Sequence, residues 1–102
     1  MNAVKVEYTV KADYVEQNKA NIRKVMDALK SNPIAGMLYS SYQKDEDPQS
    51  FVHINICKDG ETMAKLNDVT EFQAFRMGLK ASGPISPPKP TTLNIVGAGF
   101  DL

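Results

Sequence analysis

Apolar and polar residues alternate strictly over residues 3–10, AVKVEYTV. The apolar positions are Val4, Val6, Tyr8 and Val10, and polar residues occupy the positions between them. Successive side chains of an extended strand point to opposite faces, so this period of two predicts a β-strand with one buried face.

The pattern then changes to a helical one. Apolar residues recur three and four positions apart at Val15, Ile22, Val25, Met26 and Leu29, with Lys, Arg and Asn between them. This spacing predicts an amphipathic helix. Asp13 is the expected N-cap, and Glu16, three residues later, is its expected partner in a capping box. The proline of SNPIAG ends the helix, because proline cannot continue the helical hydrogen-bond ladder.

Two further strands are predicted at residues 37–44 and 50–57. The polar segment DEDPQ connects them, so we expect an antiparallel hairpin. Lys58-Asp59-Gly60 ends the second of these strands, and Asp59 is the expected cap of the segment GETMAKLND that follows.

A second helical region carries large apolar residues in EFQAFRMGLKA. We expect it to be capped by Asp68 or Thr70 and to be broken near Asn67. The segment SGPISPPKP contains four of the six prolines and is predicted to be an irregular extended loop. TTLNIVGAG, at residues 91–99, is predicted to be the last strand.

The order strand, helix, strand, strand, helix, strand predicts a ferredoxin-like α+β fold, with both helices on one face of a four-stranded antiparallel sheet. Residues 1–102 are expected to form a single domain. The strand at residues 50–57 has bulky residues on both faces: Val52, Ile54 and Ile56 on one, and Phe51, His53 and Cys57 on the other. Helices can cover only one of these faces, so we expect a homodimer that pairs the sheets through the other.

Composition excludes several classes of function. Twelve acidic and twelve basic residues give a net charge of zero, and the basic residues are scattered, which argues against nucleic-acid binding. A lone cysteine cannot form an internal disulfide and fits a reducing compartment. Neither a signal peptide nor an apolar stretch of about 20 residues is present, so the expected location is the cytoplasm rather than a membrane.

The stretch SFVHINICKD, residues 50–59, holds the chain's only histidine, His53, and its only cysteine, Cys57. At ~3.3 Å per residue these two side chains are ~13 Å apart along the strand, too far to share one metal ion, so no metal site is expected. His53 is either a general base or an imidazole bonded to a cross-strand Ser41 or Tyr39. Asn55 either orients a ligand or bonds to neighbouring backbone, and Cys57 is expected in the core.

The segment GMLYSSYQKDEDPQSFVHINICKDGETMAKL followed by TEFQAF resembles the antibiotic biosynthesis monooxygenase domain. The matching features are Gly36, the Asp47-Pro48 turn, Phe51-Val52, the acidic segment from Asp59 to Glu61, and Phe72 with Phe75. Two features depart from the family pattern. Asn55 and Cys57 replace a frequent Glu-x-Trp, and Leu66 replaces a histidine. With no tryptophan and a single histidine, haem degradation is disfavoured.

The resemblance implies a dimeric α+β barrel with a pocket between the sheet and the helices. It favours a cofactor-independent monooxygenase-like enzyme for a small, mostly apolar or aromatic metabolite, with neither a metal nor an organic cofactor. His53 would be catalytic, and the substrate would contact Asn55, Cys57, Tyr39, Phe72 and Phe75. The alternative is a non-catalytic homodimer of the same fold that binds a small molecule or acts as a stress-linked accessory protein.

Overall fold

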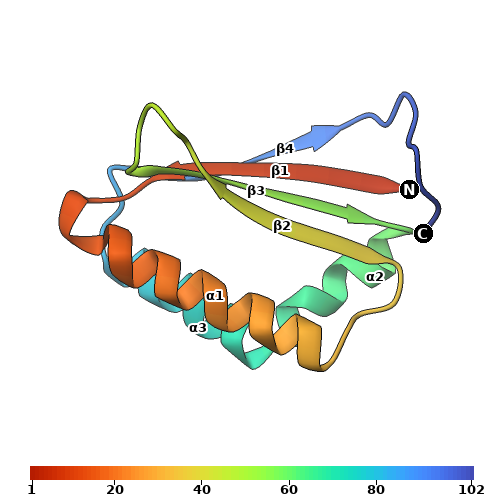
Figure 1. Ribbon diagram of the computed structural model, residues 1–102, viewed down its shortest axis with the longest axis horizontal. Helices are drawn as coiled ribbons and strands as arrows, with labels where there is room; N and C mark the ends of the chain where they lie inside the picture. Colours follow the sequence, from red (N-terminus) through yellow and green to blue (C-terminus); the bar gives the residue numbers. More distant parts are fainter.

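Four antiparallel strands and three α-helices make up the computed structural model, which describes residues 1–102 (Figure 1). The strands are β1 (Asn2–Thr9), β2 (Met37–Gln43), β3 (Ser50–Cys57) and β4 (Ser86–Leu93). The helices are α1 (Val15–Ser31), α2 (Gly60–Ala64) and α3 (Thr70–Ala81). The strand order β2-β3-β1-β4 places β3 and β1 at the centre and confirms the ferredoxin-like α+β prediction.

Both long helices lie on one side of the sheet, as Figure 1 shows. The core lies between these two layers and is formed by the buried residues Tyr8, Val10, Val25, Phe51, Phe75 and Leu79. The apolar stripe predicted on α1 faces this core, with Val25 buried and Val15, Ile22 and Leu29 packed against it.

The hairpin of β2 and β3 confirms the predicted pairing across the DEDPQ turn. Its register places Ser41 opposite His53 and Tyr39 opposite Asn55. β1 pairs with the other edge of β3 and places Val6 opposite His53. Because paired residues share a face, all of these side chains lie on the helix side of the sheet.

Two helix starts differ from the prediction. Asp13 does not cap α1; it lies in a 3₁₀ turn, Ala12–Tyr14, and α1 begins at Val15 without a side-chain cap. The expected capping box with Glu16 is therefore wrong. Neither Asp68 nor Thr70 caps α3, which is preceded by Val69 without a side-chain cap.

The prediction for Asp59 is confirmed, since its Oδ1 accepts a hydrogen bond of 2.7 Å from the backbone N–H of Thr62 at the start of α2. The predicted interruption near Asn67 is also present, as a 3₁₀ segment, Lys65–Asp68, between α2 and α3.

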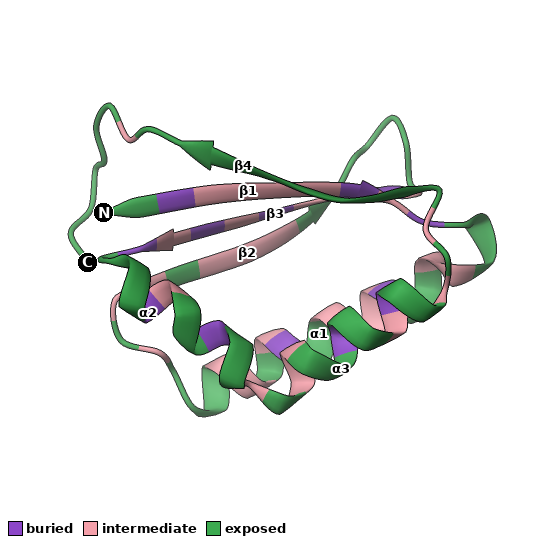
Figure 2. Ribbon diagram, turned by 180° about the vertical axis from the view of Figure 1, so that it is seen from behind, coloured by how far each residue is buried: buried purple, intermediate pink, exposed green.

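The last strand begins earlier than predicted. β4 runs from Ser86 to Leu93, so Pro87, Pro88 and Pro90 lie in a strand and not in a loop, and residues 94–99 lie beyond it. Proline lacks an N–H but is compatible with an edge strand, which has one unpaired side. β4 is such an edge, and every residue in it is exposed (Figure 2). Its ladder with β1 shifts register between Glu7 and Thr9.

The second face of the sheet has no helix over it. Its centre is formed by Val52, Ile54 and Ile56 of β3, which are only partly buried. Leu38 and Tyr42 on β2 and Leu93 on β4 are exposed on the same face. We call this surface the open sheet face. Lys5 and Glu7 of β1 lie on the same face, opposite Ile54 and Val52, and form an ion pair at the side of the apolar residues. Exposed apolar side chains gathered on β2 and β3 are typical of an interaction surface.

Candidate functional site

His53 lies at the centre of a buried hydrogen-bond network. Only 4% of the residue is exposed. Its Nε2 is 2.7 Å from the hydroxyl of Tyr8 on β1. Its Nδ1 is 2.7 Å from the hydroxyl of Tyr39 and 2.8 Å from that of Ser41, both on β2. Three strands thus hold one imidazole, and both of its nitrogens have partners.

The network continues into α1. Asn18 is completely buried, and its Nδ2 donates a hydrogen bond of 2.9 Å to the Tyr8 hydroxyl. The Asn18 Oδ1 is buried without a hydrogen-bond partner. Tyr8 can accept from Asn18 while its own O–H donates to Nε2 of His53, which leaves the proton of the neutral imidazole on Nδ1, facing Tyr39 and Ser41.

Three aromatic rings pack around the imidazole. The centroid of His53 is 5.3 Å from that of Tyr8, 5.8 Å from that of Tyr39 and 5.3 Å from that of Phe75. Phe72 meets Tyr39 edge-on at 6.1 Å. The two phenylalanines come from α3, so this cluster joins the sheet to the helix layer.

Burial sets the charge of these groups. It lowers the pKa of His53 to about 4, because the desolvated imidazolium is disfavoured. Burial also raises the pKa of both Tyr8 and Tyr39 well above that of a free tyrosine. At neutral pH the network is therefore an uncharged imidazole held by protonated phenols.

The pKa of His53 predicts a pH dependence of stability. In the unfolded chain a histidine titrates near ~6.5, so between pH 6.5 and 4 the unfolded state binds more protons than the folded state. The free energy of unfolding should therefore fall as pH is lowered through this window, by about 3 kcal/mol at ~1.4 kcal/mol per pKa unit. Urea unfolding at a series of pH values between 7 and 4 measures this decrease in the free energy of unfolding. A His53→Gln variant should show a clearly smaller decrease; an equal decrease in both proteins would contradict the assignment.

Asn55 and Cys57 form a second polar pair on β3. The thiol of Cys57 donates to the Asn55 Oδ1 at 3.1 Å, and Cys57 is fully buried. Burial raises the pKa of the Cys57 thiol, with a further contribution from Asp59, so the sulfur keeps its proton. With its oxygen occupied, the Asn55 amide has its NH₂ group left as a donor.

A cavity of about 1110 Å³ lies beside His53, between the sheet and the helical segment from α2 to α3. Tyr39, His53 and Asn55 form the polar part of its sheet side. Its apolar walls are formed by Val4, Val6, Met63, Leu66, Phe72, Phe75 and Leu79, and prolines 84, 87, 88 and 90 close a third side. This volume is slightly above the ~300–1,000 Å³ of most small-molecule sites, and an apolar lining with a few polar groups is typical of them.

The structure brings five of the six residues singled out from the sequence to this cavity: His53, Asn55, Tyr39, Phe72 and Phe75. Cys57 is not among its lining residues; it lies two positions after Asn55 on β3 and donates its hydrogen bond to the Asn55 Oδ1.

Asn18 was missed by the sequence reasoning, and Tyr8 could not be ranked above the other three tyrosines as a hydrogen-bond donor. Tyr8 could have been placed on the helix side from the alternation in β1. Asn18 interrupts the apolar stripe of α1, and a polar residue at such a position signals a buried hydrogen bond.

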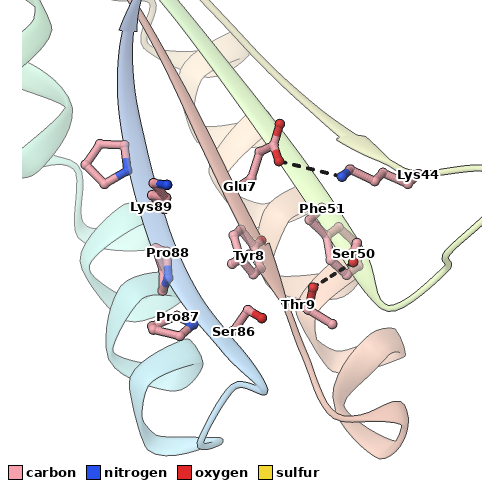
Figure 3. A pocket seen from close by; sticks show the side chains of 11 residues that line it. Glu7, Tyr8, Thr9, Lys44, Ser50, Phe51, Ser86, Pro87, Pro88 and Lys89 are labelled. Carbon is pink, nitrogen blue, oxygen red and sulfur yellow. Dashed lines mark hydrogen bonds and ion pairs between the residues drawn. The ribbon is translucent and has the colours of Figure 1, made fainter.

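A second, smaller hollow lies where β4 separates from β1, around the register shift (Figure 3). Its volume is about 590 Å³. Two of its charged groups are engaged with each other, since Lys44 lies 3.6 Å from Glu7, and Lys89 is its one charged group without an ion-pair partner. Thr9 and Ser50 share a hydrogen bond of 2.7 Å. This hollow offers few free polar groups to a ligand, so the larger cavity is the better candidate site.

The structure has no group of three or more His, Cys, Asp or Glu side chains arranged to hold a metal ion. None of its helices combines the length and apolar character that a membrane crossing requires.

Comparison with known proteins shows the fold. No protein-family model matches the sequence, and the sequence of no curated protein is significantly similar to it. Solved structures are nevertheless similar. A putative antibiotic biosynthesis monooxygenase from Nitrosomonas europaea superposes with a TM-score of 0.83 at 19% identity, over 95% of this chain and 100% of the other. A second putative antibiotic biosynthesis monooxygenase, from Deinococcus radiodurans, superposes with a TM-score of 0.79 at 14% identity, over 100% of this chain and 98% of the other. The resemblance noted from the sequence is thus confirmed for the fold.

Proposed function

We propose that the protein binds a small, mostly apolar or aromatic compound in the cavity beside His53 and oxygenates it with dioxygen, using neither a metal nor an organic cofactor. The observation that carries this proposal is the cavity itself, in which the polar groups of Tyr39, His53 and Asn55 face the apolar wall of Phe72 and Phe75. The shared fold with proteins named as antibiotic biosynthesis monooxygenases supports it as an analogy.

The proposed chemistry needs a substrate that supplies its own electrons. For a methylene group activated by aromatic rings, the overall change is R₂CH₂ + O₂ → R₂C=O + H₂O, in which the substrate provides all four electrons. His53 accepts a proton from the substrate on Nε2, in place of the hydrogen bond from the Tyr8 hydroxyl, and the carbanion reacts with dioxygen. The proton returns to the peroxide, which then loses water to give the ketone.

The neighbouring groups have separate roles in this scheme. In a substrate with a carbonyl or phenol oxygen conjugated to the methylene group, the Asn55 amide donates a hydrogen bond to that oxygen, which shares the negative charge of the carbanion. The negative charge of the new carbanion stabilises the neighbouring imidazolium and so raises the pKa of His53, whereas burial alone lowers it. Tyr39 holds the imidazole in orientation through Nδ1.

A second function is a non-catalytic binding protein for the same class of compound. The observation in its favour is that both nitrogens of His53 already have hydrogen-bond partners and that the pKa of its imidazole is lowered to about 4. Oxygen consumption separates the two functions, because only the oxygenase uses dioxygen.

We also propose that two copies pair through the open sheet face. Val52, Ile54 and Ile56 run along its centre, and Leu38 and Tyr42 extend it. A face-to-face pairing of sheets would remove these side chains from water, and a two-fold axis would make the contact self-complementary.

Titration with 2-naphthol tests binding in the cavity. Backbone amide NMR signals of His53 and Asn55 on β3 and of Phe72 and Phe75 on α3 should shift together and saturate, because the ligand would lie between both walls. Tyr39→Phe should weaken binding about five- to tenfold through the lost hydroxyl. Tyr14→Phe is the matched control, since Tyr14 lies in the 3₁₀ turn before α1 and does not line the cavity. Shifts that do not saturate, or that occur only on the open sheet face, would contradict the proposed site.

A further inference from the structure

The cavity has an unbalanced charge at its rim. Twenty-two residues line it, and none is an aspartate or a glutamate. Arg76 and Lys80 are both among them, and both are exposed, so they lie where the cavity meets solvent. In a chain of zero net charge this is a local excess of positive charge.

Neither cation is neutralised within the protein. The three ion pairs of the structure involve Lys5, Lys19 and Lys44 with glutamates, and none includes Arg76 or Lys80. Both positive charges are therefore available to a ligand.

Arg76 is held in place by neutral groups. Its guanidinium carbon lies 5.8 Å from the centroid of the Phe72 ring, and Nη1 donates to the Asn67 Oδ1 at 3.3 Å. Phe72 and Asn67 also line the cavity. A guanidinium in this position retains further N–H donors that suit the two oxygens of a carboxylate.

The spacing along α3 places these groups in one row. Phe72, Arg76 and Lys80 are separated by four residues each, so they follow one another along the same side of the helix. The row changes from an aromatic ring near the Tyr39 contact to two cations further along the helix. A ligand that matches it needs an apolar body and an acidic end.

We propose that the natural ligand is an amphipathic organic anion, an aromatic or similarly apolar compound with a carboxylate that binds Arg76 and Lys80 while its apolar body lies against Phe72 and Phe75. This inference rests on the proposed function, because it assigns the charge of the compound that the same cavity takes. The inference predicts that the cavity distinguishes anionic from neutral aromatic compounds. An uncharged aromatic compound would make no ion pair with Arg76 or Lys80.

Two ligands of the same shape test the proposal: 2-naphthoate, which carries a carboxylate, and 2-naphthamide, which is neutral. The protein has no tryptophan, so the fluorescence of the naphthalene ring reports binding without a competing indole signal. At low ionic strength we expect 2-naphthoate to bind about tenfold more tightly than 2-naphthamide, and we expect added salt to reduce this preference.

Paired substitutions locate the charges responsible. R76Q with K80Q should remove the preference for the carboxylate and leave the affinity for 2-naphthamide within about twofold. R23Q with K24Q is the matched control, because it removes one arginine and one lysine from exposed positions on α1 that do not line the cavity. The control should retain the full preference.

The outcomes separate this inference from the proposed function. Saturable binding of 2-naphthamide with no tighter binding of 2-naphthoate would overturn the inference and leave the cavity site standing. A preference that survives R76Q with K80Q, or that is lost equally in R23Q with K24Q, would also overturn it. Binding of neither compound would overturn both proposals.

Discussion

Replacing Ile54 with aspartate is expected to convert the proposed dimer into a monomer of 11.3 kDa. Ile54 lies near the middle of β3 on the open sheet face, between Lys5 of β1 and Ser40 of β2. In a symmetric dimer the substitution places a carboxylate in the interface twice. The nearest cation, Lys5, already pairs with Glu7, so removing the new carboxylate from water costs several kcal/mol and the dissociation constant should rise about 1000-fold or more.

The monomer itself should remain folded, because an aspartate at position 54 lies opposite Lys5 and is accessible to water once the partner leaves. Sedimentation over a range of concentrations measures the change. Ile85→Asp is the matched control, since Ile85 is 61% exposed and precedes β4. Sedimentation of the wild type as a monomer at micromolar concentration would contradict the proposed dimer, as would an Ile54→Asp protein that stays dimeric.

Period-two alternation and helical spacing were enough to predict the fold. They depend on which side chains leave water, and burial dominates the arrangement of β1, β3 and α1. The errors arose where local chemistry competes with tertiary contacts. Pro87, Pro88 and Pro90 indicated a loop, yet the unpaired side of an edge strand tolerates residues without an N–H. Asp13 has the chemistry of an N-cap, but a 3₁₀ turn precedes α1 instead.

The candidate site was predictable only in part. Alternation placed His53 and Asn55 on one face of β3, and a cross-strand contact of His53 with Tyr39 or Ser41 was one of two interpretations. Both contacts are present. The bond from Tyr8 to Nε2 depends on the pairing of β1 with β3, a contact between residues 45 positions apart. Sequence spacing does not report such long-range registers.

The positive charge at the rim of the cavity could not be predicted from the sequence either. Arg76 and Lys80 are ordinary members of a helix with a mixed surface, and the composition is neutral. They become notable only because the cavity beside them lacks carboxylates.

His53→Gln is the substitution with the largest expected effect on activity. Glutamine can both donate and accept hydrogen bonds, so it can still meet Tyr8 and Tyr39, but it cannot take up a proton near neutral pH. Loss of a positioned general base costs about 10²- to 10⁴-fold in rate. The free energy of unfolding at pH 7 and the affinity for 2-naphthol show whether the cavity stays intact in the variant.

Oxygen consumption is the measurement that tests the oxygenase most directly. Wild-type protein is supplied with aromatic enols, quinols and ring-activated methylene compounds, and the uptake of dioxygen is followed together with the product. We expect one dioxygen per ketone formed from the methylene substrates, and a rate at least about 100-fold lower for His53→Gln. No uptake by the wild type with any compound that binds in the cavity, or a His53→Gln rate within twofold of the wild type, would contradict it.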